Sequence, residues 1–210
     1  MLEKLVKPKE RLTTVTESTT LSEALTILED YNFRAIPIVD STGQLYRGVV
    51  YKMHLYRHLA KDGDMQLPVT AVMRNMTKFI NLDDSFFDLT FAIRDLPFIS
   101  VLDQQNHFIG IITHTRYMKL LEDSWEPEEG NYVITLVADG ERGSLDRAAK
   151  IMSRYTTLLS IVTVNPTEQL RTGRIIATLP GNLSDKTRQR MVKALERKGF
   201  VVENTETLYR

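Results

Sequence analysis

Four side chains at two corresponding places in the sequence carry groups that can bind a ligand. Tyr51 and Thr113 each end an apolar run, and His54 and Arg116 stand three residues after them. The guanidinium of Arg116 is a planar fork of donors that suits phosphate, and His54 can donate as well. The ring of Tyr51 can stack on a base, a contact of about 1 to 3 kcal/mol, although a tyrosine at the end of a strand is equally a packing residue. Thr113 offers a hydroxyl to phosphate or ribose, although threonine is also a common strand residue.

The sequence does not carry the motifs of an enzyme. His54 and His58 have the spacing of a metal-binding pair on one helix face, but Leu55 stands where a zinc protease has its glutamate. No Gly-rich phosphate loop, dinucleotide fingerprint or serine nucleophile turn occurs. We therefore expect a protein without catalytic residues, without a metal site and without a cofactor.

The elements that position these side chains form a unit that begins at Thr20. Thr20 and Glu23 have the spacing of a capping box, in which the hydroxyl accepts the N3 amide and the carboxylate returns to the cap amide. Apolar residues then recur on one face of a helix. Two short apolar runs, 35–39 and 45–50, predict a pair of strands separated by a turn, and a second helix follows them.

The same order of elements returns in a second, looser copy. Ser85 and Asp88 take the capping-box positions, and residues 98–102 and 108–112 are the expected strands. A single unit of this size buries too little apolar surface to be stable alone. We therefore expect the two repeats to pack on each other, strands against strands.

Five short segments carry this repeated pattern. They are Thr20-Leu21-Ser22-Glu23-Ala24-Leu25, Ala35-Ile36-Pro37-Ile38-Val39-Asp40, Gly48-Val49-Val50, Val72-Met73-Arg74 and Gly110-Ile111-Ile112-Thr113. Together they resemble the two motifs of a tandem CBS-domain pair, and the resemblance covers roughly the first 60 per cent of the chain. CBS pairs are regulatory modules, seldom catalytic, that bind adenosine-containing ligands in clefts between the repeats. The resemblance implies such a cleft here.

The resemblance also bears on the ligand. Nucleotide-binding CBS motifs place an aspartate for the ribose hydroxyls where this sequence has His54 and Arg116. Without that carboxylate, a free ribose diol loses its bidentate acceptor, which argues against AMP or ATP bound in the usual way. A ribose whose 3′ oxygen is already esterified to phosphate suits Arg116, and cyclic di-AMP has this chemistry. The ligand-binding residues that the resemblance implies are Ala35, Ile36, Tyr51, His54, Ile99, Ser100, Thr113 and Arg116.

The composition is that of an ordinary soluble protein, and we expect it in the cytoplasm. Lysine plus arginine equals aspartate plus glutamate at 27 each, so the net field does not attract nucleic acid or anionic membrane over long range. No segment reaches the roughly 20 apolar residues of a membrane helix, and the amino terminus lacks a signal-peptide core. The absence of cysteine excludes disulfides and cysteine nucleophiles. Neither nucleic acid nor a membrane is an expected partner.

A different pattern follows the acidic segment 122–130, which contains proline and glycine and is the expected linker. The order strand, helix, strand, strand, helix, strand over about 75 residues predicts a ferredoxin-like sheet with helices on one face. With the turn Asp139-Gly140-Glu141-Arg142-Gly143-Ser144-Leu145, this part resembles an ACT domain. The predicted α+β (or α/β) chain consists of a CBS pair over 1–121 (motifs about 12–60 and 69–121), the linker, and an ACT-like domain over 131–210.

The combination resembles bacterial cyclic-di-AMP-binding CBS proteins and acetoin-utilisation-type CBS-ACT regulators, and it predicts a sensor without catalytic activity. We expect the CBS cleft to bind an adenine nucleotide, cyclic di-AMP in particular, and a homodimer to relay occupancy to a downstream protein. Two alternatives stay open: an ACT-like domain that binds an amino acid at its first turn, beside a structural CBS pair, or a dimerisation scaffold without ligand. In the scaffold, His54 and Arg116 are ordinary exposed residues, and Ile36 and Ile99 belong to the core.

Overall fold

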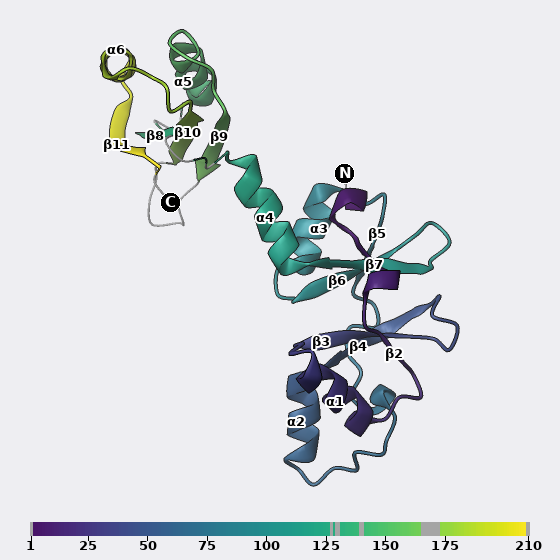
Figure 1. The fold of residues 1–210 in the computed structure, drawn as a ribbon. Coiled ribbons are helices and arrows are strands. Elements are labelled where there is room, and N and C mark those ends of the chain that lie inside the picture. Colours follow the sequence, from purple (N-terminus) through teal and green to yellow (C-terminus); the bar gives the residue numbers. More distant parts are fainter. Residues whose placement is uncertain (1, 127, 129–130, 139–140, 165–172, 209–210) are drawn as a thin grey trace. The chain divides into compact units, whose positions relative to one another are not determined.

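The computed structural model describes residues 2–126, 128, 131–138, 141–164 and 173–208. The chain divides into two compact units, Met1–Met118 and Lys119–Arg210, whose elements are labelled in Figure 1. Helix α4 (His114–Ser124) spans the boundary and extends into the segment 122–130 that was expected to be a linker. The acidic residues there support the helix, because Lys119 pairs with Glu122 at 3.6 Å and with Asp123 at 2.9 Å. Pro127, Glu129 and Gly130 lie outside the described residues.

Unit 1 contains two repeats with the same order of elements, as the sequence predicts. Both capping boxes form: Thr20 Oγ1 accepts from the Glu23 amide at 3.2 Å, and Ser85 Oγ accepts from the Asp88 amide at 3.1 Å. The first repeat consists of β2 (Val15–Thr16), α1 (Leu21–Asp30), β3 (Ala35–Val39), β4 (Tyr46–Tyr51) and α2 (Lys52–Leu59). The second consists of β5 (Phe79–Asn81), α3 (Phe86–Ile93), β6 (Phe98–Leu102), β7 (Phe108–Thr113) and α4.

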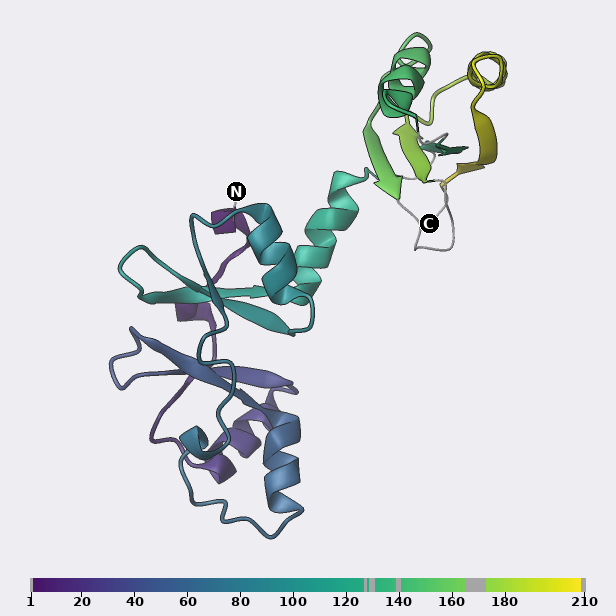
Figure 2. The same cartoon turned by 180° about the vertical axis from the view of Figure 1, so that it is seen from behind.

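In unit 1, the segment that leads into each repeat pairs with the sheet of the other repeat. Strand β1 (Lys7–Pro8), which lies between the 3-10 helices η1 (Leu2–Leu5) and η2 (Lys9–Arg11), pairs antiparallel with β7 of the second repeat. After the 3-10 helix η3 (Val69–Ala71), the chain forms a bridge from Arg74 to Val49 of the first repeat. The sheet orders are β2-β3-β4 and β1-β7-β6-β5. The two repeats are therefore interlocked, as the views in Figures 1 and 2 show.

The repeated glycine of the two motifs lies at these two crossings. A Cβ on Gly48 would come within 2.8 Å of the Arg74 carbonyl oxygen, and a Cβ on Gly110 would meet the Lys7 carbonyl group. The backbone of each crossing segment can approach only because the strand carries no side chain at that point. The repetition of glycine in the sequence thus reflects the packing of one repeat on the other.

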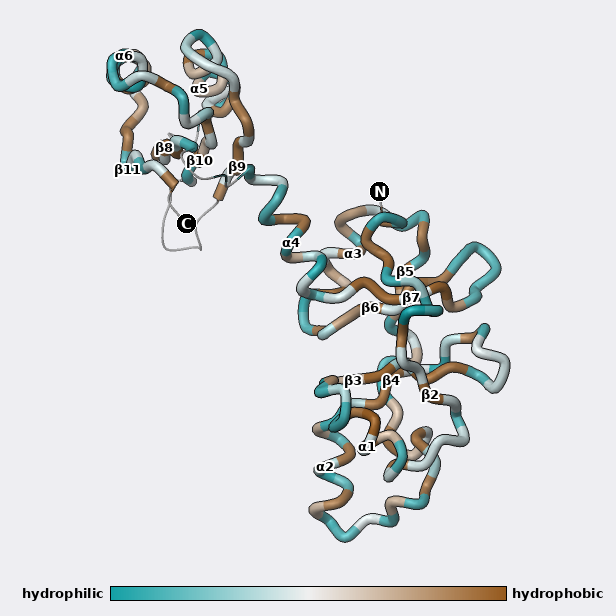
Figure 3. The backbone as a smooth tube through the Cα atoms, in the orientation of Figure 1, coloured by the Kyte–Doolittle hydropathy of each residue, from teal (hydrophilic) through white to brown (hydrophobic). Residues whose placement is uncertain are grey.

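The strands of unit 1 separate two kinds of core. Side chains alternate along a strand, so Val39 and Val49 pack on Phe98 and Ile111 of the other repeat, whereas Ile38 packs beneath the helices of its own repeat. In Figure 3 much of these strands is brown, the colour of hydrophobic residues. Full burial of each Leu, Ile or Val side chain contributes about 1.5 to 3 kcal/mol to the free energy of folding. The apolar contacts between the two sheets therefore hold the repeats together.

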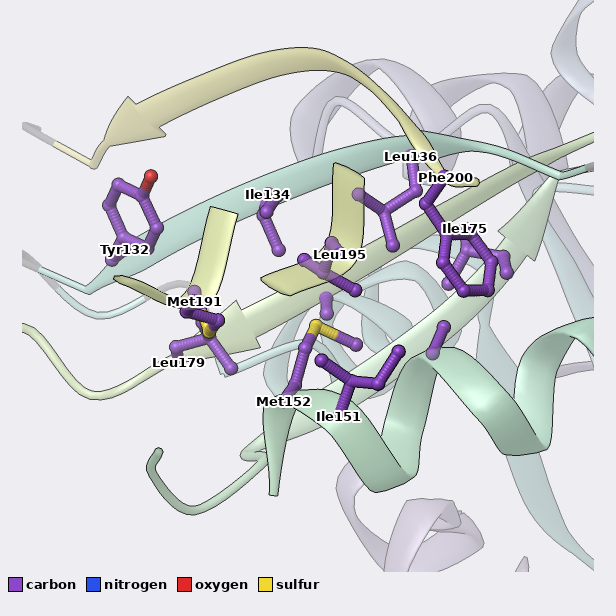
Figure 4. Close-up of a cluster of buried hydrophobic side chains, with 12 residues drawn as sticks. Tyr132, Ile134, Leu136, Ile151, Met152, Ile175, Leu179, Met191, Leu195 and Phe200 are labelled. Carbon is purple, nitrogen blue, oxygen red and sulfur yellow. The ribbon is translucent and has the colours of Figure 1, made fainter. Parts of the chain in front are cut away.

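Unit 2 has the ferredoxin-like order of strands that the sequence predicts. Its elements are β8 (Tyr132–Val137), α5 (Ser144–Met152), β9 (Ser160–Val164), β10 (Arg174–Leu179), α6 (Asp185–Glu196) and β11 (Val201–Thr207). The sheet order is β11-β8-β10-β9, and all neighbours are antiparallel. Figure 4 shows the core that both helices cover, in which Met152, Met191 and Leu195 are fully buried. Ser184 caps α6, because its Oγ accepts from the Thr187 amide at 3.3 Å.

None of the helices in the described part of the chain combines the length and the apolar character that crossing a bilayer requires.

Candidate functional site

A cleft of about 1020 Å³ opens between the two repeats of unit 1. The repeats contribute equivalent positions, because Ala35 and Phe98 each begin the first strand of a hairpin and Tyr51 and Thr113 each end the second. The amino-terminal segment forms a further wall. The lining residues that can contact a ligand by charge, ring or hydroxyl are Lys7, Arg11, Thr13, Phe33, Arg34, Tyr51, Lys52, Tyr56, Arg94, Asp95, Thr113, His114 and Thr115.

The lining is strongly positive. Among the described residues around the cleft, five carry a permanent positive charge, and Asp95 is the carboxylate that faces them. Asp95 lies 3.3 Å from the guanidinium of Arg94, in an exposed pair that contributes little to stability. A concave surface with charge of one sign raises the local concentration of counter-ions. The cations are Lys7, Arg11, Arg34, Lys52 and Arg94.

Tyr51 is held in place at the cleft by a hydrogen-bond chain. Its hydroxyl accepts from Asn75 Nδ2, and the carbonyl of Asn75 accepts from the hydroxyl of Tyr46 at 2.7 Å. The ring of Tyr46 stacks on Phe108 of the second repeat at a centroid distance of 6.1 Å. Burial raises the pKa of both tyrosines. A ring fixed in this way loses little entropy when a base stacks on it.

Three of the residues predicted from the sequence line the cleft, namely Ala35, Tyr51 and Thr113. Thr113 has a second role, since its Oγ1 accepts from the Arg116 amide at 3.2 Å at the start of α4. Ile36 and Ile99 are 1% exposed and lie outside the lining. They follow Ala35 and Phe98 directly, so strand alternation turns them to the helix-covered faces.

Ser100, another predicted ligand residue, is also outside the lining and is 1% exposed. It is two residues beyond Phe98 on the same strand face, and it is therefore covered by the opposing sheet.

His54 and Arg116 lie outside the lining as well. The ring of His54 packs on the ring of Tyr51 at a centroid distance of 5.4 Å, and burial, together with Arg74 and Arg57, lowers the pKa of His54. Helix α2 instead presents Met53 and Tyr56, which are three residues apart, to the cleft. The roles of His54 and Arg116 in ligand binding stay predictions.

Arg116 has a different contact. Its Nη2 donates to the Lys4 carbonyl at 2.8 Å, which ties α4 to the amino-terminal segment. That segment contains Lys7 and Arg11, two cleft cations that sequence reasoning left out of the site. The sequence signal was a run of cations before residue 12, but nothing local indicates that a two-residue strand carries them to the second repeat.

The histidine pair of α2 does not converge on one point. His58 Nε2 is 3.2 Å from the Asp64 carbonyl oxygen, while His54 lies against Tyr51. Within the described ranges, no three His, Cys, Asp or Glu side chains lie together in a way that could hold a metal ion.

Comparisons with known proteins address the fold. Residues 4–61 match the CBS domain family. Solved structures resemble the chain as well: CbpB from Streptococcus agalactiae has a TM-score of 0.51 and 20% identity, covering 58% of this chain and 80% of that one. Unit 1 has the CBS-pair fold. The CBS domain pair/ACT domain protein of Thermotoga maritima has a TM-score of 0.50 and 22% identity, covering 58% of this chain and 96% of that protein.

Two structures with this fold contain adenine nucleotides. One is CbpB in complex with c-di-AMP, with a TM-score of 0.52 and 20% identity over 58% of this chain and 84% of that one. The other is CBSX2 in complex with AMP, with a TM-score of 0.50 and 19% identity over 58% and 96%. No curated protein sequence matches the chain. At these identities the comparisons establish the fold of the CBS pair.

Proposed function

We propose that the CBS pair binds an adenine nucleotide in the cleft between its repeats, and that the chain is a regulatory sensor rather than an enzyme. The observation that carries the proposal is the positive cleft itself, with its volume of about 1020 Å³. A pocket of this size accepts a ligand as large as a dinucleotide. Its five cations favour a ligand with more than one phosphate.

The distribution of chemical groups favours cyclic di-AMP among adenine nucleotides. The first repeat supplies the rings of Tyr51 and Tyr56 for stacking, and the second supplies the hydroxyls of Thr113 and Thr115. Within the described lining, the carboxylate is that of Asp95, which lies in the loop before β6 and not three residues after Tyr51 or Thr113, where nucleotide-binding CBS motifs place the acceptor for a ribose diol. A cyclic dinucleotide has no 2′,3′-diol and has two phosphates, so it suits this lining better than AMP or ATP.

The fold supports the same proposal, because CbpB and CBSX2, which share it, have been solved with c-di-AMP and with AMP. In a homodimeric sensor, occupancy of the cleft would be passed to a downstream protein. Such a relay requires the ligand to bind one arrangement of the repeats more tightly than another.

Calorimetric titration with cyclic di-AMP, AMP, ATP, S-adenosylmethionine and a panel of amino acids tests the proposal. We expect saturable binding of cyclic di-AMP and weaker binding of AMP and ATP. Lys52→Ala should weaken it, and Arg57→Ala is the matched control, because Arg57 lies on the same helix outside the cleft. Preference for AMP or ATP would contradict the ligand assignment. Equal effects of the two variants would contradict the site.

One observation favours a second candidate function, the binding of an amino acid by unit 2. Ser144 begins α5, is 7% exposed, and its Oγ has no hydrogen-bond partner among the described residues. A helix start with an unused hydroxyl suits a carboxylate. Asp139, which the sequence also placed in this turn, lies outside the described residues. Binding of an amino acid that Ser144→Ala abolishes would support this function, and a chain that binds no small molecule would be a scaffold.

A further inference from the structure

The amino-terminal segment of the chain belongs structurally to the second repeat. Leu2 and Leu5 are buried, at 2% and 8% exposure, and β1 places Lys7 opposite Ile111 of β7. Arg116 adds the third anchor, through its 2.8 Å hydrogen bond to the Lys4 carbonyl. The segment thus lies between two anchored points, its buried leucines and its short strand.

The same segment carries two of the five cleft cations. Lys7 and Arg11 line the cleft, followed by Leu12 and Thr13. Strand β1 is only two residues long, so its ladder supplies few hydrogen bonds to fix the direction in which these side chains point. Their position therefore depends on the anchors on either side of the strand. The Arg116 contact at Lys4 lies three residues before Lys7, and Lys9 Nζ, between the two cations, donates to the Gly43 carbonyl at 3.5 Å.

We infer that Arg116 is a positioning residue of the nucleotide site: by binding the Lys4 carbonyl it holds the segment that presents Lys7 and Arg11 to the ligand phosphates. This inference rests on the proposed function. It gives Arg116 a part in phosphate binding although its guanidinium lies outside the cleft lining. A residue that acts in this way affects affinity only while the cations that it positions are present.

A double-mutant cycle separates positioning from direct contact, since residues that act through one another show non-additive effects. Arg116→Ala is measured in the wild-type chain, in the Lys7→Ala/Arg11→Ala variant and in Arg94→Ala. Arg94 is the matched control, because it lines the same cleft from the loop between α3 and β6 and does not belong to the amino-terminal segment. Arg116→Lys is the conservative variant that keeps a donor for the Lys4 carbonyl.

The readouts are the dissociation constant of cyclic di-AMP and the ligand-free amide hydrogen exchange of residues 2–13. We expect Arg116→Ala to weaken binding roughly 3- to 10-fold in the wild-type and Arg94→Ala chains, and less than about 2-fold when Lys7 and Arg11 are already absent. Exchange over residues 2–13 should become faster in Arg116→Ala, and Arg116→Lys should restore most of both properties.

The outcomes distinguish this inference from the function on which it rests. If the wild-type chain binds no nucleotide, the proposed function is wrong and the inference is overturned with it. If the wild-type chain binds, but Arg116→Ala causes the same loss with and without Lys7 and Arg11, the inference alone is overturned and Arg116 contacts the ligand directly. Unchanged exchange over residues 2–13 in Arg116→Ala would also overturn it.

Discussion

Replacing Gly110 with alanine should weaken unit 1 more than any other glycine substitution at its turns and strands. The residue has φ +155°, and an added Cβ would meet the Lys7 carbonyl group and come within 2.8 Å of Val6 Cγ1. Overpacking costs about 1 to 3 kcal/mol, and the backbone conformation costs another 1 to 3 kcal/mol or so in a residue with a side chain. The chain can escape only by releasing the segment, which exposes Leu2 and Leu5 at about 1.5 to 3 kcal/mol each. The first route predicts a loss of roughly 2 to 6 kcal/mol and the second a loss of roughly 3 to 6 kcal/mol.

Two other glycines provide controls for this substitution. A Cβ on Gly48 would meet the flexible Met73 side chain at 2.6 Å as well as a carbonyl oxygen, so Gly48→Ala should cost less than Gly110→Ala. Gly43 has φ +70° and nothing within 4 Å of an added Cβ, so Gly43→Ala should cost about 1 kcal/mol. Urea unfolding followed by far-UV circular dichroism measures the series. Gly110→Ala within 0.5 kcal/mol or so of the wild type would refute the reasoning.

Three further results are expected. Tyr51→Phe removes the hydrogen bond with Asn75 and should lower the free energy of unfolding by about 0.5 to 1.5 kcal/mol in urea titrations. The ring is retained but less firmly fixed, so nucleotide affinity should fall about two- to tenfold. The Thr42 hydroxyl and backbone amides lower the pKa of Asp40 to about 2, so this carboxylate stabilises the fold above its unfolded pKa near 4, and the stability is lost as the pH falls towards 2. Asp40→Asn should therefore show a smaller loss of stability over that range of pH, measured as urea midpoints. Cyclic di-AMP affinity should fall steadily as the concentration of one salt rises from about 50 to about 500 mM, because salt screens the attraction between the cleft cations and the phosphates. Calorimetry measures this dependence, and an affinity that does not change with salt would contradict it.

Local signals account for the parts of the fold that the sequence predicted. The capping box of α1 involves only Thr20 and Glu23, which are three residues apart, so it can be predicted without knowing any contact that is distant in sequence. The order of elements in unit 2 follows from the periodicity of its apolar residues, which alternates between that of strands and that of helices. Its sheet order follows because the element order βαββαβ is typical of the ferredoxin-like fold. The packing of the two repeats on each other was predictable from the repetition, because each copy has an apolar strand face that it cannot bury alone.

The residues that line the cleft were harder to predict from the sequence than the fold. Adjacent residues of a strand point to opposite faces, so Ala35 and Ile36 could not both line one cleft, and strand alternation could have excluded Ile36 and Ile99. The amino-terminal strand is different: two residues have no measurable period, and Lys7 reaches its place through a pairing with Ile111, far along the chain. Such non-local pairing is set by the whole fold.

The most direct test of the proposed nucleotide site is amide hydrogen exchange of the whole chain with and without saturating cyclic di-AMP. Binding in the cleft predicts slower exchange in the segments 7–13, 32–37, 51–56, 94–98 and 111–115, which line it from both repeats and from the amino-terminal segment. Exchange in unit 2 should change less than in these segments. Protection confined to residues 141–152, or no protection anywhere at a saturating concentration, would contradict a nucleotide site between the repeats.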